Sequence, residues 1–329
     1  MGDWDGMEIR RIQKTPDGTF FITIPKEWAS GLGLSKGSAV RLVNEGGRIS
    51  MEPWRGEEAE GALREAMIHP SPLIGREIVE KYLSGYDLIR IRSDSVIDSK
   101  ARERIKAALK TLIGMEILEE DSKNIVIQCV IEPELLNPGK ILRRLHSVAA
   151  SMQADSLRSM IEGDVELAST VVERDEEVDR LYFLLVRALR AALSEGKPRR
   201  PDFPSPKECM DYRLLATYIE AAADCAVAIA VLAKDSAVRL NGEQAAAMAE
   251  AGRRIHEAFK GAFEAVLSGD LELASRIHHS KPEMEGELIR LGKSLLKGPA
   301  EAEAIFGLLS SLTRMCEISV DMADLTASR

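Results

Sequence analysis

Aromatic residues are scarce in this chain: Phe, Trp and Tyr make up 5% of its 329 residues. Apolar residues still reach 45% of the total, mainly as aliphatic side chains. The abundance of Ala, Leu and Glu favours long helices over a large sheet, because these residues have high helix propensity. A chain of this length is too long to fold around a single hydrophobic core, so we expect two or three domains.

Cysteines are also few, and the four present form no CxxC pair. This pattern argues against a disulfide framework or a zinc finger and is typical of reduced core residues in the cytosol. The N-terminus is acidic and lacks the apolar run of a signal peptide. The longest apolar run, residues 225–233, is shorter than the ~20 residues of a membrane span. We therefore expect a cytoplasmic protein.

The most informative pattern is an internal repeat. Residues 163–169 (GDVELAS) and 269–275 (GDLELAS) match at six of seven positions, and the seventh exchanges Val for Leu. The C-terminal half is therefore a duplication. Gly, Pro and polar breakers divide it into six helices, which imply two antiparallel three-helix bundles. The helices are expected at about 138–162, 164–195, 206–234, 243–268, 270–297 and 300–327.

Residues 7–53 are expected to form a small β unit. Strands are predicted at 7–14, 19–24, 39–43 and 48–51, with a short helix opened by Pro25. So short a segment cannot bury a sufficient core alone and should pair with a second copy. The order TPDG turn, IPKEW, LGLSKGS and EGG turn resembles the AbrB/MazE/SpoVT family of swapped-hairpin barrels. That resemblance implies that two chains interlock into one barrel that binds DNA.

Basic residues are relatively concentrated in this unit. Residues 1–55 contain eight Lys and Arg against seven Asp and Glu, whereas the whole chain has a net charge of −9. An acidic chain would not coat nucleic acid non-specifically, but dimerisation would double a local basic patch that neutralises phosphates. The alternative is a solvated outer face of a small barrel. The candidate DNA contacts are Arg10, Arg11, Lys14, Lys26, Arg41 and Arg48.

Residues 56–135 are expected to form a small α+β unit, which begins with a linker or short helix at 56–61. Two helices are predicted after this stretch, and the second should run from an Asp98 N-cap to a Gly114 C-cap. We identify no nucleophile, phosphate loop or metal cluster in it, and His69 is interpreted as a surface residue. The unit is interpreted as a spacer, although it could also bind an effector. Helices are predicted at 73–83 and 98–113, and strands at 87–92, 115–119 and 124–131.

Carboxylates on the second and third helices of the first repeat carry the candidate chemistry. Residues 175–179 read DEEVD, and a second acidic pair stands four residues apart among alanines, so each pair shares one helical face. Carboxylates on a face suited to burial must be solvated, protonated or neutralised by a cation. Facing pairs would surround one cavity with oxygen ligands for Fe, Mn, Mg or Zn. The candidate ligands are Asp175, Asp179, Glu220 and Asp224.

The second repeat keeps part of this pattern. Its third helix carries the same acidic pair 97 residues later, but on its second helix a shift of 106 residues places Lys281 opposite Asp175. Because a lysine replaces one carboxylate, we expect this site to bind fewer ions or to bind them more weakly. The candidate ligands are Glu285, Glu317 and Asp321, while His278 is interpreted as either a compensating ligand or a helix-surface residue.

Two duplicated three-helix bundles with D-x-x-V-D-x-L on one helix and E-x-x-x-D-x-A on the next resemble PhoU, the phosphate-transport regulator. An AbrB-like domain ahead of a PhoU domain is similar to archaeal phosphate-uptake regulators. The resemblance implies multinuclear iron or zinc clusters, a cytoplasmic location, and contact with the ATPase of a phosphate ABC transporter or with a signalling partner. The Arg and Gly usual within E-R-x-G-D are Ala221 and Ala223 here.

These patterns lead to one main hypothesis and two alternatives. The main hypothesis is a non-enzymatic regulator of multidomain α+β fold that binds metal ions, DNA and a second copy of itself. A di-metal enzyme of ferritin-like type is disfavoured, because none of the five histidines follows a Glu at the i, i+3 spacing. A dimeric adaptor without DNA binding is the third hypothesis. The expected domains are 1–55, 56–135, 136–240 and 241–329.

Overall fold

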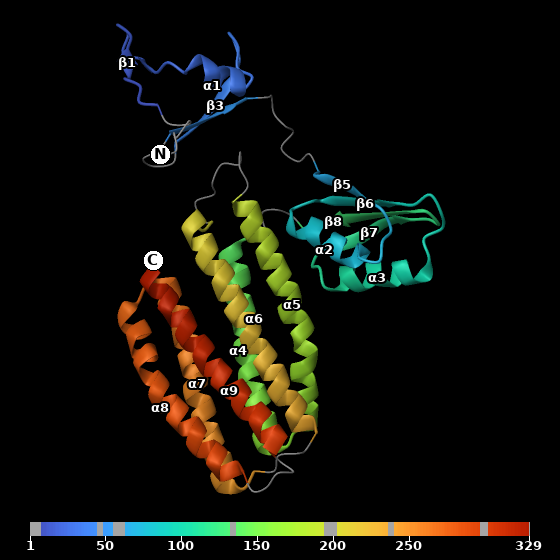
Figure 1. Ribbon diagram of the computed structural model, residues 1–329, viewed down its shortest axis with the longest axis vertical. Helices are drawn as coiled ribbons and strands as arrows, with labels where there is room; N and C mark the ends of the chain where they lie inside the picture. The colour runs from blue at the N-terminus through green and yellow to red at the C-terminus, as the bar shows by residue number, and fades with distance from the viewer. Residues whose placement is uncertain are drawn as a thin grey trace, which may run out of the picture. The chain divides into compact units, whose positions relative to one another are not determined.

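The structure is a computed structural model that describes residues 8–44, 49–54, 63–131, 136–193, 203–235, 240–296 and 302–328. It confirms a multidomain α+β fold in which long helices dominate (Figure 1). The described residues up to 54 form one compact unit, and those from 63 onward form a second. The linker or short helix expected at 56–61 lies outside the described residues.

The first unit is built from two antiparallel ribbons and one short helix. The predicted TPDG turn is confirmed, since the Gly18 N–H donates to the Thr15 carbonyl and Gly18 has a φ of 97°. The elements are β1 (Gln13–Lys14), β2 (Phe20–Phe21), α1 (Lys26–Gly31), β3 (Val40–Asn44) and β4 (Ile49–Pro53).

Strands β1 and β2 contain two residues each and are much shorter than predicted. A strand lengthens only where a neighbour supplies hydrogen bonds, and the described part of this unit supplies few. No described side chain of the unit is buried, and large apolar residues such as Ile9 (91% exposed) and Ile49 (73% exposed) face solvent. So much exposed apolar surface is the physical reason to expect a second copy.

The second unit begins with a four-stranded sheet in the order β5-β6-β8-β7, in which β5 is parallel to β6 and the other pairs are antiparallel. Helices α2 and α3 cover one face, and Ile78, Tyr82 and Ile105 enter the shared core (Figure 1). The elements are β5 (Glu65–Ile68), α2 (Ile74–Leu83), β6 (Leu88–Arg92), α3 (Ser99–Lys110), β7 (Met115–Glu120) and β8 (Asn124–Cys129).

Two details of this sheet domain differ from the sequence expectations. Strand β5 was not predicted, because four residues offer too short a pattern. Gly114 is not the C-cap of α3, which ends earlier with Thr111 as its cap. Gly114 has a φ of 78° just before β7, and a Cβ there would lie 2.1 Å from the Ile131 side chain. Close approach and positive φ, rather than helix capping, therefore require this glycine.

Six helices complete the second unit and confirm the two predicted three-helix bundles (Figure 1). The duplicated GD motif acts identically in both copies. Gly163 (φ 71°) and Gly269 (φ 73°) end one helix, and Asp164 and Asp270 cap the next by accepting a backbone N–H. The helices are α4 (Pro138–Glu162), α5 (Val165–Ala192), α6 (Pro206–Lys234), α7 (Gly242–Ser268), α8 (Leu271–Leu295) and α9 (Ala302–Asp324).

Helix α6 is the most apolar of these elements, with a mean hydropathy of 1.7 over 18 residues. By length and composition alone it is the one described helix that could cross a membrane. Its contacts give a different account, because it packs against α4, α5 and α9. Its apolar composition is that of a core helix between the two repeats.

Arg187 on α5 joins the first bundle to the sheet domain. Its guanidinium is 4% exposed and donates to the carbonyls of Tyr82 (2.7 Å) and Tyr86 (2.9 Å) and to Asp87 Oδ1 (2.8 Å). The same group lies 4.9 Å from the centre of the Tyr82 ring. This buried cation makes three hydrogen bonds, one of them to a carboxylate, and so holds the two domains in one orientation.

Replacement of this arginine should loosen the joint. Arg187→Met keeps the apolar stem but leaves two carbonyls without their charged donor, so we expect a loss of ~2–4 kcal/mol in the free energy of unfolding. Chemical denaturation of the full chain measures it. Arg180→Met, an exposed arginine on the same helix, is the matched control, and an equal loss in both variants would contradict the role of Arg187.

Candidate functional site

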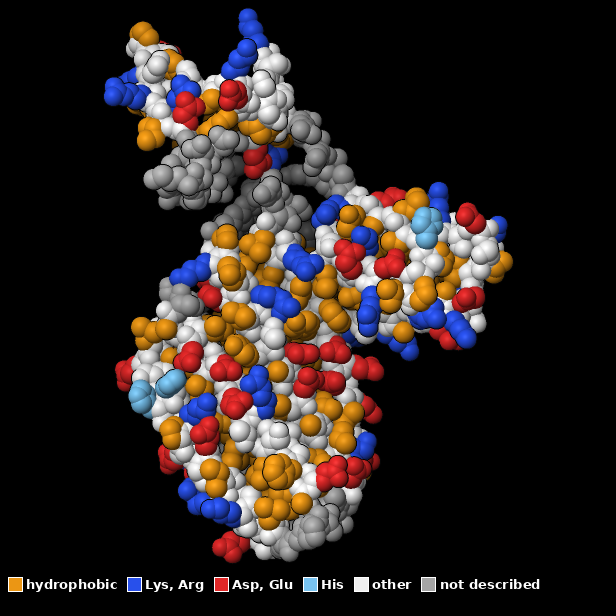
Figure 2. Space-filling model, viewed as in Figure 1, with side chains coloured by type: hydrophobic (Ala, Val, Ile, Leu, Met, Phe, Trp, Pro, Cys, Tyr) orange, Lys and Arg blue, Asp and Glu red, His pale blue; other side chains and the backbone are white. Residues whose placement is uncertain are grey.

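The four candidate ligands of the first repeat lie on two helices that pack against each other. Asp175 and Asp179 stand one turn apart on α5, and Glu220 and Asp224 one turn apart on α6. Residues beside them, such as Ala223, are buried in the core, whereas Asp224 is exposed and the other three carboxylates are half-buried. Figure 2 shows acidic side chains gathered over these two helices.

Little positive charge compensates this carboxylate cluster among the described residues. Within the described residues, none of the four side chains has a hydrogen bond or an ion pair. Burial raises the pKa of all four carboxyls. Repulsion then raises three of the values further: Asp224 acts on the pKa of Asp175, Asp179 and Glu220. The cluster is therefore a region of uncompensated negative charge.

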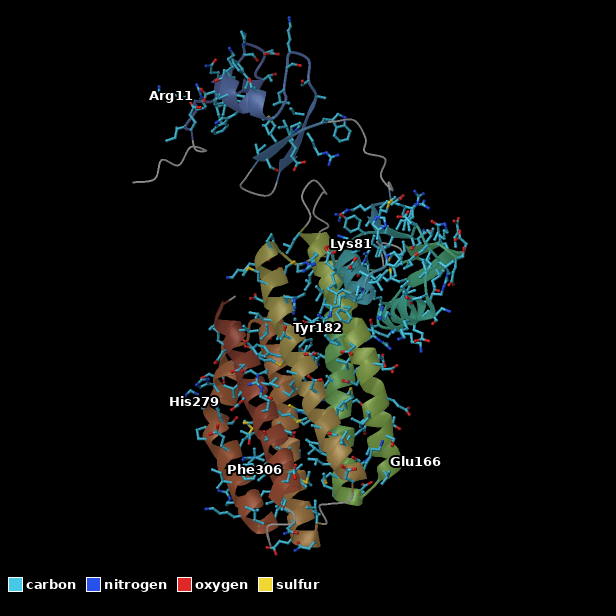
Figure 3. All side chains as sticks on the ribbon, turned by 45° about the vertical axis from the view of Figure 1, so that its right-hand side comes forward. Arg11, Lys81, Glu166, Tyr182, His279 and Phe306 are labelled. Atoms are coloured by element: carbon cyan, nitrogen blue, oxygen red, sulfur yellow. The ribbon has the colours of Figure 1, made fainter. Side chains whose placement is uncertain are left out.

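One cation, Arg213, acts weakly on the cluster, and its own contacts are with other residues. Arg213 lowers the pKa of Glu220, but less than burial and the neighbouring carboxylates raise it. Its guanidinium lies 4.9 Å from the ring of Tyr182 on α5 (Figure 3), and its Nη1 donates to Thr217 Oγ1 at 2.7 Å. Arg213 is thus engaged beside the cluster rather than paired with it.

The donor set fits a divalent cation in kind, although the side chains do not yet surround one. In the parts of the chain that the structure describes, no three His, Cys, Asp or Glu side chains converge closely enough to hold a metal ion. Four carboxylates on adjacent helices supply the hard oxygen ligands that Mg, Mn and Fe accept, and Zn also binds carboxylates.

The corresponding carboxylates of the second repeat have cations beside them. Arg314 Nη1 lies 3.1 Å from Glu317 Oε2 and 3.9 Å from Asp321 Oδ2. Lys281 Nζ lies 3.8 Å from Glu285 Oε1. The donor set here therefore fits a metal ion less well than that of the first repeat. Lys281 therefore lies beside this site, and its effect on metal binding stays a prediction.

Arg314 is the residue that the sequence analysis missed. The 97-residue offset that relates Glu220 to Glu317 also relates Thr217 to Arg314, so the first repeat has a neutral residue where the second has a cation. The comparison of repeats could have revealed it. Arg314 also acts across the junction of α6 and α9: burial raises the pKa of the Cys225 thiol to about 11, and the Arg314 charge opposes that rise.

His278 has a partner of its own. Its Nδ1 lies 3.1 Å from Asp324 Oδ1, and the side chain is largely exposed. Of the two interpretations of His278, the structure therefore favours a helix-surface residue. His279 hydrogen-bonds within its own helix, to the Ser275 carbonyl at 2.7 Å.

Most of the candidate DNA contacts are exposed on the first unit, as Arg11 in Figure 3 illustrates. Arg10 forms an ion pair with Glu8, Lys14 lies 5.4 Å from the centre of the Phe20 ring, and Lys26 begins α1. Arg41 is half-buried with its guanidinium 4.5 Å from the Trp54 ring. Arg48 lies outside the described residues.

Comparison with known families identifies two domains. Residues 142–233, which span most of α4 through α6, match the PhoU domain, and residues 13–56 match MazE, the bacterial antitoxin of antidote-toxin recognition. The crystal structure of PhoU from Pseudomonas aeruginosa is similar at 17% identity with a TM-score of 0.49, covering 57% of this chain and 93% of that one. No curated protein sequence matches significantly. Both resemblances expected from the sequence are confirmed.

The raised pKa values predict how pH changes the stability of the metal-free protein. A carboxyl with a raised folded-state pKa binds more protons when folded, so the contribution of this cluster to stability is most favourable at low pH and falls as pH rises above the ordinary values near 4. Removing two of the charges with Glu220→Gln and Asp224→Asn should therefore raise the melting temperature at pH 7. Solvent screens these partly exposed groups, so we expect roughly 2–4 °C.

Thermal melting in chelator at pH 7 and pH 4 measures the effect. The gain should shrink at pH 4, where the carboxyls of the parent protein take up protons. Glu173→Gln, an exposed carboxylate on α5 with no pKa effect on the cluster, should leave the melting temperature unchanged. A double variant that melts lower than the parent at pH 7 would contradict the account.

Proposed function

Because the chain carries a PhoU domain and, ahead of it, a MazE-type domain, we propose that it is a non-enzymatic, cytoplasmic regulator of phosphate uptake or phosphate signalling. The observation that carries the proposal is the carboxylate cluster on α5 and α6. All four residues fall inside the segment that matches the PhoU domain. A cluster without a compensating cation is a site where binding of a metal ion can change the state of the protein.

In the proposed site, Asp175 and Asp179 on one side and Glu220 and Asp224 on the other hold the metal. The ion supplies positive charge that cancels the repulsion among the carboxylates and links α5 to α6. Iron or zinc is the expected ion, and magnesium and manganese suit the same oxygen donors. The second cluster binds less, because Arg314 and Lys281 already neutralise it.

Helix α5 offers a route from the metal site to the sheet domain. Asp179 and Arg187 stand eight residues apart on this helix, about 12 Å at 1.5 Å per residue. A change in how α5 packs on α6 therefore reaches the buried Arg187 joint through one rigid element. We therefore propose that metal binding controls how the sheet domain docks on the first bundle. The partner that recognises this change is the phosphate-transporter ATPase or a signalling protein.

The first unit provides the proposed output to DNA. Its exposed apolar residues favour a dimer, and a dimer doubles the basic side chains on its surface. MazE is an antitoxin of antidote-toxin recognition, so binding of a protein ligand is the competing function of the same unit. The salt dependence of DNA binding separates the two uses, because it reports directly on phosphate contacts.

Metal binding should be confined largely to the first repeat. Titration of chelator-treated full chain with Mn²⁺, Fe²⁺ or Zn²⁺, followed by elemental analysis, should show binding that Asp179→Asn with Glu220→Gln reduces at least tenfold. The matched pair Glu285→Gln with Glu317→Gln should retain it. Conversely, Lys281→Asp with Arg314→Gln restores the charge pattern of the first repeat and should increase the number of bound ions. Equal loss in both paired variants would contradict the proposed asymmetry.

DNA binding should depend on the basic residues of the first strand. We expect Arg10→Ala, Arg11→Ala and Lys14→Ala together to weaken retardation of the protein's own promoter fragment at least tenfold, because each basic side chain that binds a phosphate releases a counterion and so adds to the affinity. The affinity of the parent protein should fall steeply between 50 and 200 mM salt. Retardation that is independent of salt and unchanged in the triple variant would favour protein recognition by this unit.

A further inference from the structure

A second, separate feature lies at the junction of the two repeats. Helices α4 and α7 pack side by side and border a groove of about 440 Å³. Its lining mixes apolar and polar side chains and carries more positive than negative charge. Its polar and charged lining residues include Arg143, His146, Ser147, His256, Lys260 and Glu264. None of them belongs to the carboxylate cluster.

His146 is the unusual member of this lining. The side chain is 7% exposed, stacks on the ring of Phe263 at 3.8 Å between centroids, and lies 4.9 Å from the ring of Phe259. Its Nε2 is buried and has no hydrogen-bond partner among the described residues. A buried polar atom without a partner destabilises the fold, so this nitrogen favours a ligand.

The missing partner must be a hydrogen-bond donor. Burial lowers the pKa of His146 to about 4, so the ring is neutral near pH 7 and carries one proton. The Phe259 carbonyl forms the ring's hydrogen bond to the backbone, and a carbonyl accepts only. Since Nε2 has no partner, we assign the proton to the other nitrogen and a lone pair to Nε2.

Cations border the same groove without partners of their own. In the described part of the chain, Arg143 and Lys260 are exposed and form no ion pair or hydrogen bond. His256 is already engaged, with its Nδ1 2.9 Å from Gln153 Oε1. The one carboxylate of the lining, Glu264, leaves an excess of positive charge. The groove therefore offers two cationic donors beside a buried acceptor.

We propose that this groove binds a phosphate group that keeps one P–OH, with the hydroxyl donating to His146 Nε2 and the anionic oxygens facing Arg143 and Lys260. Exposed side chains of the groove move aside to admit it, because Nε2 is covered in the present arrangement. Ser147 lies on the same side of α4 and adds a hydroxyl donor.

This chemistry distinguishes phosphate from sulfate. Phosphate retains at least one proton at neutral pH and donates it to a lone pair, whereas sulfate has none to donate. Sulfate would leave Nε2 unsatisfied, and a buried site that hydrogen-bonds its ligand rejects the analogue lacking that bond. The role of this site in regulation rests on the proposed function, whereas phosphate binding itself does not.

Calorimetric titration of the metal-free full chain with inorganic phosphate and with sulfate tests the site. Phosphate should bind at least tenfold more tightly than sulfate. Lys260→Gln and Arg143→Gln, both surface changes, should each weaken phosphate binding roughly tenfold. Lys293→Gln, which removes an exposed lysine on α8 outside the groove, is the matched control and should bind as the parent does.

His146→Phe tests selectivity. Phenylalanine can stack on Phe259 and Phe263 but accepts no hydrogen bond, so phosphate affinity should fall to that of sulfate. Equal affinities for the two anions in the parent protein, or equal losses in Lys260→Gln and Lys293→Gln, would overturn the proposal. Because the titration uses metal-free protein and no DNA, its failure leaves the metal and DNA proposals standing, and their failure leaves phosphate binding standing.

Discussion

The arrangement of the helical region depends on how it accommodates like charges between packed helices. Four carboxylates approach one another where α5 meets α6. Burial raises the pKa of all four, and repulsion adds to this rise for Asp175, Asp179 and Glu220. The same face of the second repeat carries Arg314 and Lys281, which form ion pairs with its carboxylates. One duplicated scaffold thus has two electrostatic states, one balanced within the chain and one with an excess of negative charge, to which we assign the proposed metal ion.

This difference places the proposed sensor in the first repeat, next to the sheet domain. Helix α5 carries two of the four carboxylates and also Arg187, whose guanidinium is buried against Tyr82, Tyr86 and Asp87 of the sheet domain. Helix α6, the apolar core helix, carries the other two and contacts α9 of the second repeat. A change at the cluster therefore acts on both neighbours through packed elements.

Much of this arrangement could be predicted from the sequence because it depends on local patterns. Gly163, Gly269 and the aspartates after them mark helix ends by their own chemistry, and the repeat determined the number of helices. The acidic pairs followed from i, i+4 spacing. Strand β5 escaped prediction because its four residues offer too short a pattern. The true end of α3 escaped it because Gly114, which looked like a helix cap, is required instead by its positive φ and its close approach to Ile131.

The contacts between distant segments were also beyond the sequence. Nothing in the sequence distinguishes Arg187 from the other arginines, and only the fold brings it to Asp87, 100 residues earlier. His146 gave no signal, since its burial between aromatic rings depends on α7. Arg314 could have been recognised by aligning the two repeats, but its ion pairs require the rotamers that the structure shows.

The central claim is that an ion bridges α5 and α6 in the first repeat. The most direct measurement is anomalous diffraction at the metal absorption edge from crystals of the metal-loaded chain. The account predicts the strongest anomalous peak among Asp175, Asp179, Glu220 and Asp224, and a weaker peak or none beside Glu317 and Asp321. A dominant peak in the second repeat, or none between α5 and α6, would contradict it.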